Sequence, residues 1–326
     1  MRRRTVVLRK SGVLRKISAA IPVAAVAAAA VAAAVTPAAW TVAPALAAVT
    51  AARPAPAITG EAAPGGITAS AAAGASDSLV RAPGVLLPRT RLPRLPLAAS
   101  VTSGNWAGYA AVADAHVQLR YIRADFKIPA LNCARSPVGS SGYAYVGHWV
   151  GLDGYNSTGG GTVEQVGVDA SCNARRAASY YAWYETYPAP PVVYGGVRPG
   201  DSIATSVYYN GSGYNLVLAD KTTGKHFAVT ARCPAGSVCK NSSAEVITED
   251  PGGAVSGGYN LADFAAVNYN GVAITSRNGT HSTLTASSLW TSSRVSMLDP
   301  AGQLMARPSA LAARGQSFTV SWQRPS

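Results

Sequence analysis

The sequence predicts an all-β domain built from many short strands. Three features indicate this: apolar residues that alternate with period two, turn residues between the alternating runs, and no convincing amphipathic helix. Strands of this length and number pack as a sandwich, a jelly roll or a barrel. The alternation begins near residue 101, so we expect one folded domain over residues 101–326, which is long enough to bury a large core.

The first residues of the chain predict an export signal. Residues 1–16 carry seven Lys or Arg and no acid, and an Ala/Val-rich apolar run follows from Ile17 to Val35. Ala45-Leu46-Ala47 then has the small-x-small pattern of a signal-peptidase site. We expect a signal peptide over residues 1–47, secretion by the Sec route or, because of Arg3-Arg4, the twin-arginine route, and no stable membrane association afterwards. The alternative is an uncleaved membrane anchor, since the apolar run is long enough to span.

Residues 48–100 are rich in Ala, Pro, Gly and Ser and bury too little apolar surface to fold, so we expect disorder. This segment is either a linker or a propeptide that covers an acidic cleft, with processing between Leu95 and Ser103. The net charge of the chain is +13, but residues 1–100 contribute 12 of the 28 basic residues and only two acids. The domain that follows is nearly balanced, which argues against a nucleic-acid partner. We expect a monomer.

The clearest strands form a meander in the middle of the domain. Ser202–Tyr209, Tyr214–Asp220 and His226–Thr230 are predicted strands, joined by turn residues at 210–213 and 221–224. Phe318, Val320 and Trp322 alternate in what should be the last strand.

The four cysteines all lie in the predicted domain. An even count in an exported chain indicates disulfides. Cys233 and Cys239 are close enough to close a small loop, which leaves Cys133 to pair with Cys172. No Cys or His spacing is typical of zinc, so we expect no metal.

Two regions place polar and aromatic side chains on one face of a strand. In the first, between Val146 and Pro188, the runs V-G-H-W-V-G-L-D-G-Y, T-V-E-Q-V-G-V-D and Y-A-W-Y-E-T-Y-P each carry Trp, Gln, Glu or Asp at alternate positions. In the second, Ala244 to Asp250, Glu245, Ile247 and Glu249 share a face. Such strands are typical of a sheet that lines a wet groove.

The residues in this groove permit hydrolysis by an acid and an amide. The chain has no G-x-S-x-G, H-E-x-x-H or D-[TS]-G motif, and none of its four histidines stands in the context of a catalytic triad. A half-buried Glu takes a proton from water and later returns it to a leaving amine, and a Gln orients the water and stabilises the oxyanion. Two alternatives use the same groove: a module that binds glycan or peptide without cleaving it, and a glycoside hydrolase with two Glu.

Six motifs in order resemble those of the glutamic peptidases, or eqolisins, from about Ser103 to the C-terminus. They are Asn105-Trp106 with Gly108, W-V-G-L-D-G from Trp149, Q-V-G-V-D from Gln165, W-Y-E-T-Y-P from Trp183, G-D-S-I from Gly200 and A-E-V-I-T-E-D from Ala244. Glu164 before Gln165 and Pro251 after Asp250 depart from the family pattern.

This resemblance implies a secreted, bacterial-type endopeptidase that cleaves polypeptides without a cofactor and works best at acidic pH. It implies a sandwich of two antiparallel sheets similar to a concanavalin-type jelly roll. Glu249 would be the general base and acid, and Gln165 the catalytic amide. The remaining candidates would line the cleft or support these two residues: Trp106, Trp149, Asp153, Asp169, Glu185 and Tyr187.

Overall fold

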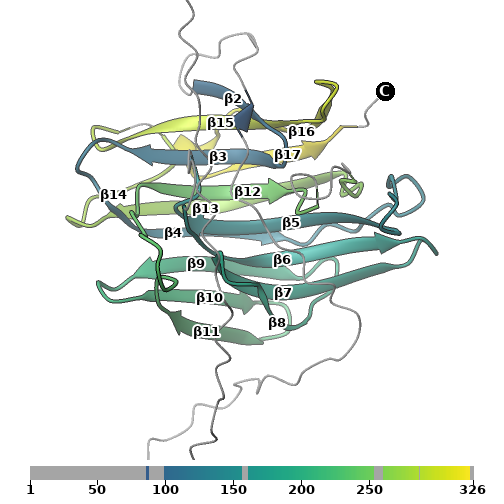
Figure 1. Ribbon diagram of the computed structural model, residues 1–326, viewed down its shortest axis with the longest axis horizontal. Helices are drawn as coiled ribbons and strands as arrows, with labels where there is room; N and C mark the ends of the chain where they lie inside the picture. Colours follow the sequence, from purple (N-terminus) through teal and green to yellow (C-terminus); the bar gives the residue numbers. More distant parts are fainter. Residues whose placement is uncertain (1–85, 88–98, 156–160, 253–259, 286, 324–326) are drawn as a thin grey trace, which may run out of the picture. The chain divides into compact units, whose positions relative to one another are not determined.

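A computed structural model of the protein describes residues 86–87, 99–155, 161–252, 260–285 and 287–323 (Figure 1). The predicted signal peptide and most of the predicted linker lie outside the described residues. Two short pieces of that linker segment are nevertheless paired: β1 (Leu86–Leu87) and the start of β2 (Ala99–Ser103). Leu86 lies opposite Ser103, so regular strand pairing begins ahead of residue 101.

One sheet carries most of the predicted motifs. Its strands follow the order β1-β2-β15-β3-β12-β5-β6-β7-β8, and every pairing is antiparallel except β2 with β15. Beyond β1 and β2, the strands are β3 (Trp106–Ala113), β5 (Tyr143–Leu152), β6 (Val163–Asn173), β7 (Ala178–Tyr187), β8 (Val192–Gly196), β12 (Ser243–Glu249) and β15 (Trp290–Leu298).

The second sheet follows the order β11-β10-β9-β4-β13-β17-β16, with the short β14 beside β13. Its strands are β4 (Leu119–Lys127), β9 (Ser202–Tyr209), β10 (Tyr214–Asp220), β11 (His226–Ala231), β13 (Ala266–Ser276), β14 (His281–Ser282), β16 (Leu304–Pro308) and β17 (Phe318–Trp322). The three strands of the predicted meander and the predicted last strand are confirmed.

The two sheets stack with their strands running in similar directions, as Figure 1 shows. β5 and β6 face β4, β9 and β10 of the other sheet. The sheets are joined along one edge, where β16 pairs with both β15 and β17. The only helical turn among the described residues is a 3-10 turn at Ala313–Gly315. The predicted all-β sandwich is therefore confirmed.

No helix in the described part of the chain is long and apolar enough to cross a membrane.

The core lies between the sheets and follows the alternation of the strands. Val146 and Val150 of β5 and Val166 and Val168 of β6 are fully buried and belong to one apolar cluster. The central strands of the first sheet are buried on both faces; every residue of β12 is buried. One face of β12 therefore packs into the core, and the other carries the polar motifs.

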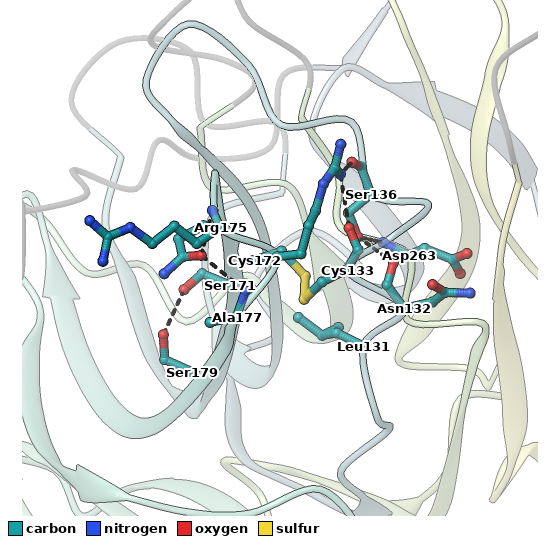
Figure 2. Close-up of a disulfide and its surroundings, with 12 residues drawn as sticks. Leu131, Asn132, Cys133, Ser136, Ser171, Cys172, Arg175, Ala177, Ser179 and Asp263 are labelled. Atoms are coloured by element: carbon teal, nitrogen blue, oxygen red, sulfur yellow. Dashed lines mark hydrogen bonds between the residues drawn. A yellow bond between two sulfur atoms is a disulfide. The ribbon is translucent and has the colours of Figure 1, made fainter.

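Two disulfides hold the connections between strands, and they are the predicted pairs Cys133–Cys172 and Cys233–Cys239. Figure 2 shows the first, which ties the loop after β4 to the end of β6. Beside it the Ser136 hydroxyl accepts a hydrogen bond from the backbone N–H of Asp263 at 2.9 Å. Three segments that are far apart in sequence are thus fixed at one end of the sandwich.

Candidate active site

All of the predicted site residues except Asp153 gather on one face of the first sheet, the face turned away from the second sheet. We call it the site face. Strand register places Glu249 beside Trp106 of β3, Ile247 beside Trp149 of β5, and Gln165 beside Glu185. An apolar cluster on this face includes Trp106, Trp149, Trp183 and Ile247. Within each strand these residues stand at the alternate positions that point away from the core, as the sequence pattern predicts.

Glu249 ends β12 and is fully buried. Its carboxylate accepts hydrogen bonds from two uncharged donors: the Trp149 indole N–H at 2.8 Å on Oε2 and the Asn105 amide at 3.4 Å on Oε1. Both donors favour the ionised form of the carboxyl group, because they bond to its charge. Asn105 belongs to the first of the six family motifs but is not one of the predicted site residues.

Asn105 is held in place by its own turn. The Ser103 hydroxyl donates to Asn105 Oδ1 at 3.1 Å and accepts from the backbone N–H of Trp106 at 3.1 Å. Because the amide oxygen is occupied, the amide nitrogen points to Glu249. The Ser-x-Asn-Trp spacing is the signal from which this contact was predictable.

Trp149 lies flat on the sheet because its neighbours are glycines. A β-carbon at Gly167 would lie 2.5 Å from Trp149 Cβ, and one at Gly151 would lie 3.0 Å from Trp149 Cζ3. Both distances are too short for ordinary packing. Trp106 packs edge-on against the indole, with ring centroids 5.0 Å apart. The indole N–H is thereby aimed at Glu249.

Gln165 is paired with Glu185 on the neighbouring strand. Its side-chain Nε2 donates to Glu185 Oε2 at 2.6 Å. Its Oε1 is buried and has no hydrogen-bond partner in the described part of the chain. The site face therefore offers one buried amide oxygen free to accept a hydrogen bond.

Glu249 and Gln165 lie on the same face with β5 between them. Glu249 is opposite Gly147 of β5, and Gln165 is opposite Gly151. The two side chains are thus two strands apart and offset by four residues along β5.

The other candidates fall into two groups. Asp169 and Tyr187 lie on the site face; Asp169 accepts a hydrogen bond from the Tyr181 hydroxyl at 3.0 Å, and Tyr187 is opposite Val163. Asp153 does not contact Glu249 or Gln165. It accepts the backbone N–H groups of Asn241 at 2.6 Å and Ser242 at 2.7 Å, and so holds the segment that leads into β12.

Two further acids are buried near Asp153. Glu245 is on the site face, and burial raises its pKa well above the ordinary value, with smaller contributions from the charges of Asp153 and Glu164. Glu164 is on the opposite face, where its Oε1 lies 3.1 Å from the Cys239 sulfur. Burial also raises the pKa of Glu164 well above the ordinary value, as does the charge of Asp153. Both groups are therefore neutral at acidic pH. Burial raises the pKa of Asp153 as well, but its backbone hydrogen bonds oppose that change.

His148 points into the core and not toward the site. Its Nδ1 lies 3.2 Å from the Thr248 hydroxyl and 3.3 Å from that of Tyr269. Burial lowers the pKa of His148 to about 3. A neutral imidazole on the core face is a structural residue, which agrees with the absence of a catalytic-triad context in the sequence.

No group of three or more His, Cys, Asp or Glu in the described segments is arranged to hold a metal ion. The chemistry available on the site face is that of carboxylates, amides and indole N–H groups.

Comparison with known proteins defines the class to which this fold and site belong: glutamic endopeptidases. The model of the peptidase A4 family matches residues 104–299, the part that contains all the motifs above. The chain belongs to the peptidase A4 family. The prediction of a glutamic endopeptidase is confirmed, and the alternative of a non-catalytic binding module is not supported.

Solved structures show the same fold. Scytalidoglutamic peptidase with a peptide-based transition-state analogue is 24% identical, with a TM-score of 0.53, and the match covers 68% of this chain and 98% of that one. SCP-B, a member of the eqolisin family in complex with the tripeptide Ala-Ile-His, is 24% identical, with a TM-score of 0.51 and the same coverage. A search of curated proteins found no match.

Proposed function

We propose that the protein is an exported endopeptidase in which Glu249 and Gln165 activate one water molecule. The Glu249 carboxylate takes a proton from the water, and the oxygen adds to the carbonyl carbon of the scissile peptide. Gln165 orients the water and stabilises the oxyanion of the tetrahedral intermediate. When the C–N bond breaks, the carboxyl group of Glu249 returns its proton to the leaving amine.

The observation that carries this proposal is the environment of Glu249. A fully buried carboxyl group acts as a base only if its charged form is stabilised. The Trp149 indole and the Asn105 amide provide that stabilisation without neutralising the charge. An Arg or Lys in their place would make the carboxylate a weaker base.

The strand register leaves room for a shared water. With usual strand spacings, a flat sheet places two Cα atoms with this offset about 16 Å apart. Both side chains rise from the same face on either side of β5, so a water or a substrate bound above β5 lies between them.

The Gln165–Glu185 hydrogen bond supports a double role for the amide. An amide has two N–H groups and one oxygen. Glu185 binds one N–H, which fixes the orientation of the group. The second N–H is then available to an oxyanion, and the free Oε1 is available to a hydrogen of the attacking water.

Working at acidic pH is supported by the buried acids. Burial raises the pKa of Glu164 and of Glu245, so the stability that their protonated forms contribute is full below the ordinary pKa of Glu and is lost as the pH rises toward the raised values. His148 acts in the opposite direction, because its lowered pKa favours unfolding in acid.

We also propose that the protein is exported and that its N-terminal segment is then removed. A cut between Leu95 and Ala99 would leave β2 whole and retain Ser103, whose hydroxyl fixes Asn105. N-terminal sequencing of the secreted protein tests this step; a mature chain that starts beyond Ser103 would contradict it.

The catalytic assignment is tested by digestion of denatured protein from pH 2 to pH 8 with four purified proteins: wild type, Glu249→Gln, Gln165→Met and Glu245→Gln. Each substitution nearly preserves volume. Glu245 is four residues from Glu249 on the same strand and face, so it controls for the loss of a buried acid. We expect no cleavage by the first two variants and cleavage by the third. Undiminished cleavage by Glu249→Gln would overturn the proposal.

A further inference from the structure

A polar cavity lies where the two sheets join. It has a volume of about 320 Å³, and its lining includes Arg294 of β15, Arg307 of β16, Ser321 of β17 and Gln323. Arg294 is opposite Tyr109, whereas its neighbour Val295 belongs to the cluster on the site face. The cavity therefore lies away from the site face, and the proposal below does not depend on the proposed catalytic mechanism.

Arg294 is a buried cation. It is 8% exposed and forms no ion pair with any described residue. One Nη2–H donates to the carbonyl oxygen of Pro308, and the fully buried Nε has no hydrogen-bond partner in the described part of the chain. Guanidinium groups stay charged in proteins and are costly to bury unpaired. The structure thus leaves positive charge and hydrogen-bond donors facing a cavity.

Arg307 adds a second guanidinium to the same cavity. It is exposed, makes no ion pair in the described part of the chain, and is opposite Ser321 in the strand register. Burial lowers the pKa of Arg294, and the charge of Arg307 lowers it further. The two cations repel each other, and the lining contains no acid that would separate them.

The phenol of Tyr109 does not supply the missing negative charge. Its hydroxyl donates to the backbone oxygen of Ser309 at 2.7 Å, and burial raises its pKa, so it is neutral. The remaining polar groups of the lining, Ser309, Ser321 and Gln323, are uncharged donors or acceptors.

We propose that Arg294 and Arg307 bind an oxyanion of the phosphate or sulfate class. Two guanidinium groups from adjoining strands, with Ser321 in the same lining, match the several oxygens of a tetrahedral anion. Such an anion removes the repulsion between the two cations. It thereby strengthens the edge where β15, β16 and β17 meet.

The test is thermal unfolding of the purified full chain in phosphate and in sulfate, with sodium chloride added to hold the ionic strength constant. Both anions stabilise proteins generally, so the comparison is between variants. Arg307→Gln removes the exposed cation, and Arg294→Lys retains the charge but loses the planar fork. Arg175→Gln is the control, because it removes one exposed Arg that lies elsewhere, on the turn after β6.

We expect saturable stabilisation of the wild type and of Arg175→Gln. In Arg307→Gln the apparent dissociation constant should rise by about tenfold or more, the effect of losing a charge-assisted hydrogen bond. Arg294→Lys should also bind more weakly. Identical anion responses in wild type and Arg307→Gln would overturn the proposal, as would equal stabilisation by chloride alone.

A second binding experiment, with O-phosphoserine, identifies the source of the anion. O-phosphoserine carries the same group on an amino acid. Tighter binding of O-phosphoserine than of phosphate would indicate an anion borne by a peptide, whereas weaker binding would indicate the free ion. If the substitution of Arg307 weakens the binding of neither compound, the proposed site does not exist.

Discussion

Replacing Trp149 by Phe removes a single donor from Glu249 and leaves most of the ring in place. The Trp149 indole nitrogen lies 2.8 Å from Glu249 Oε2, and both residues are fully buried. A hydrogen bond to a charged group contributes about 1.5–3 kcal/mol. If Glu249 must be ionised to act, this loss moves the acid limb of the pH–activity profile to higher pH by about 1 to 2 pH units.

Trp106→Phe is the matched control. Trp106 is also buried and packs on Trp149, but its indole nitrogen has no hydrogen-bond partner in the described structure. The assay is kcat/KM for a peptide substrate measured at half-unit pH steps, with unfolding temperatures recorded for both variants. We expect the limb to move in Trp149→Phe alone. An equal movement in both variants, or in neither, would refute the assigned role of the indole N–H.

Four further predictions concern pH and covalent structure. His148 has a pKa of about 3 in the folded state, so it withdraws up to about 5 kcal/mol of stability as the pH falls from about 6.5 to 3. His148→Gln should flatten that slope in urea titrations, and an unchanged slope would show that His148 is not responsible. Glu245→Gln should match the wild type near pH 4 and exceed it in stability at pH 8, because the raised pKa of Glu245 makes its ionisation unfavourable only in the folded state. A variant that is less stable than wild type at pH 8 would contradict this. Glu164→Gln should behave in the same way, and chemical denaturation at the two pH values measures it. Loss of Cys133–Cys172, with a separation of 39 residues, should cost about 4 kcal/mol, whereas loss of Cys233–Cys239, with a separation of 6, should cost about 2 kcal/mol; the reverse order in denaturation of the two double Cys→Ala variants would contradict the loop-entropy argument.

The strands could be predicted because alternation and turn residues involve positions that are close in sequence. In β9 and β10 the buried residues alternate strictly, and the turn between them is fixed by Asn210, whose side chain accepts the N–H groups of Ser212 and Gly213. Period-two alternation also assigned the polar residues of β5, β6, β7 and β12 to one face each.

The Gln165–Glu185 pair follows from a local feature as well. Asn173 accepts the N–H groups of Arg175 and Ala177 and so closes a tight turn between β6 and β7. That turn sets the register in which Gln165 is opposite Glu185. The pairing was therefore accessible from the sequence, although the alternation alone did not reveal it.

The contacts of Glu249 were not accessible in this way. Asn105 is 144 residues from Glu249 and Trp149 is 100 residues away, so their meeting depends on β12 inserting between β3 and β5. Only the family motifs pointed to these residues together. Asp153 belongs to such a motif, yet its hydrogen bonds hold the segment before β12. The spacing of residues within the motif does not distinguish this structural role from a position in the cleft.

The shared role of Glu249 and Gln165 is best tested by a crystal structure with a tetrahedral, non-hydrolysable peptide analogue. We predict that one analogue oxygen lies within hydrogen-bonding distance of both the Glu249 carboxylate and the Gln165 amide, on the site face above β5. An analogue bound on that face with its tetrahedral centre beyond the reach of either side chain would contradict it.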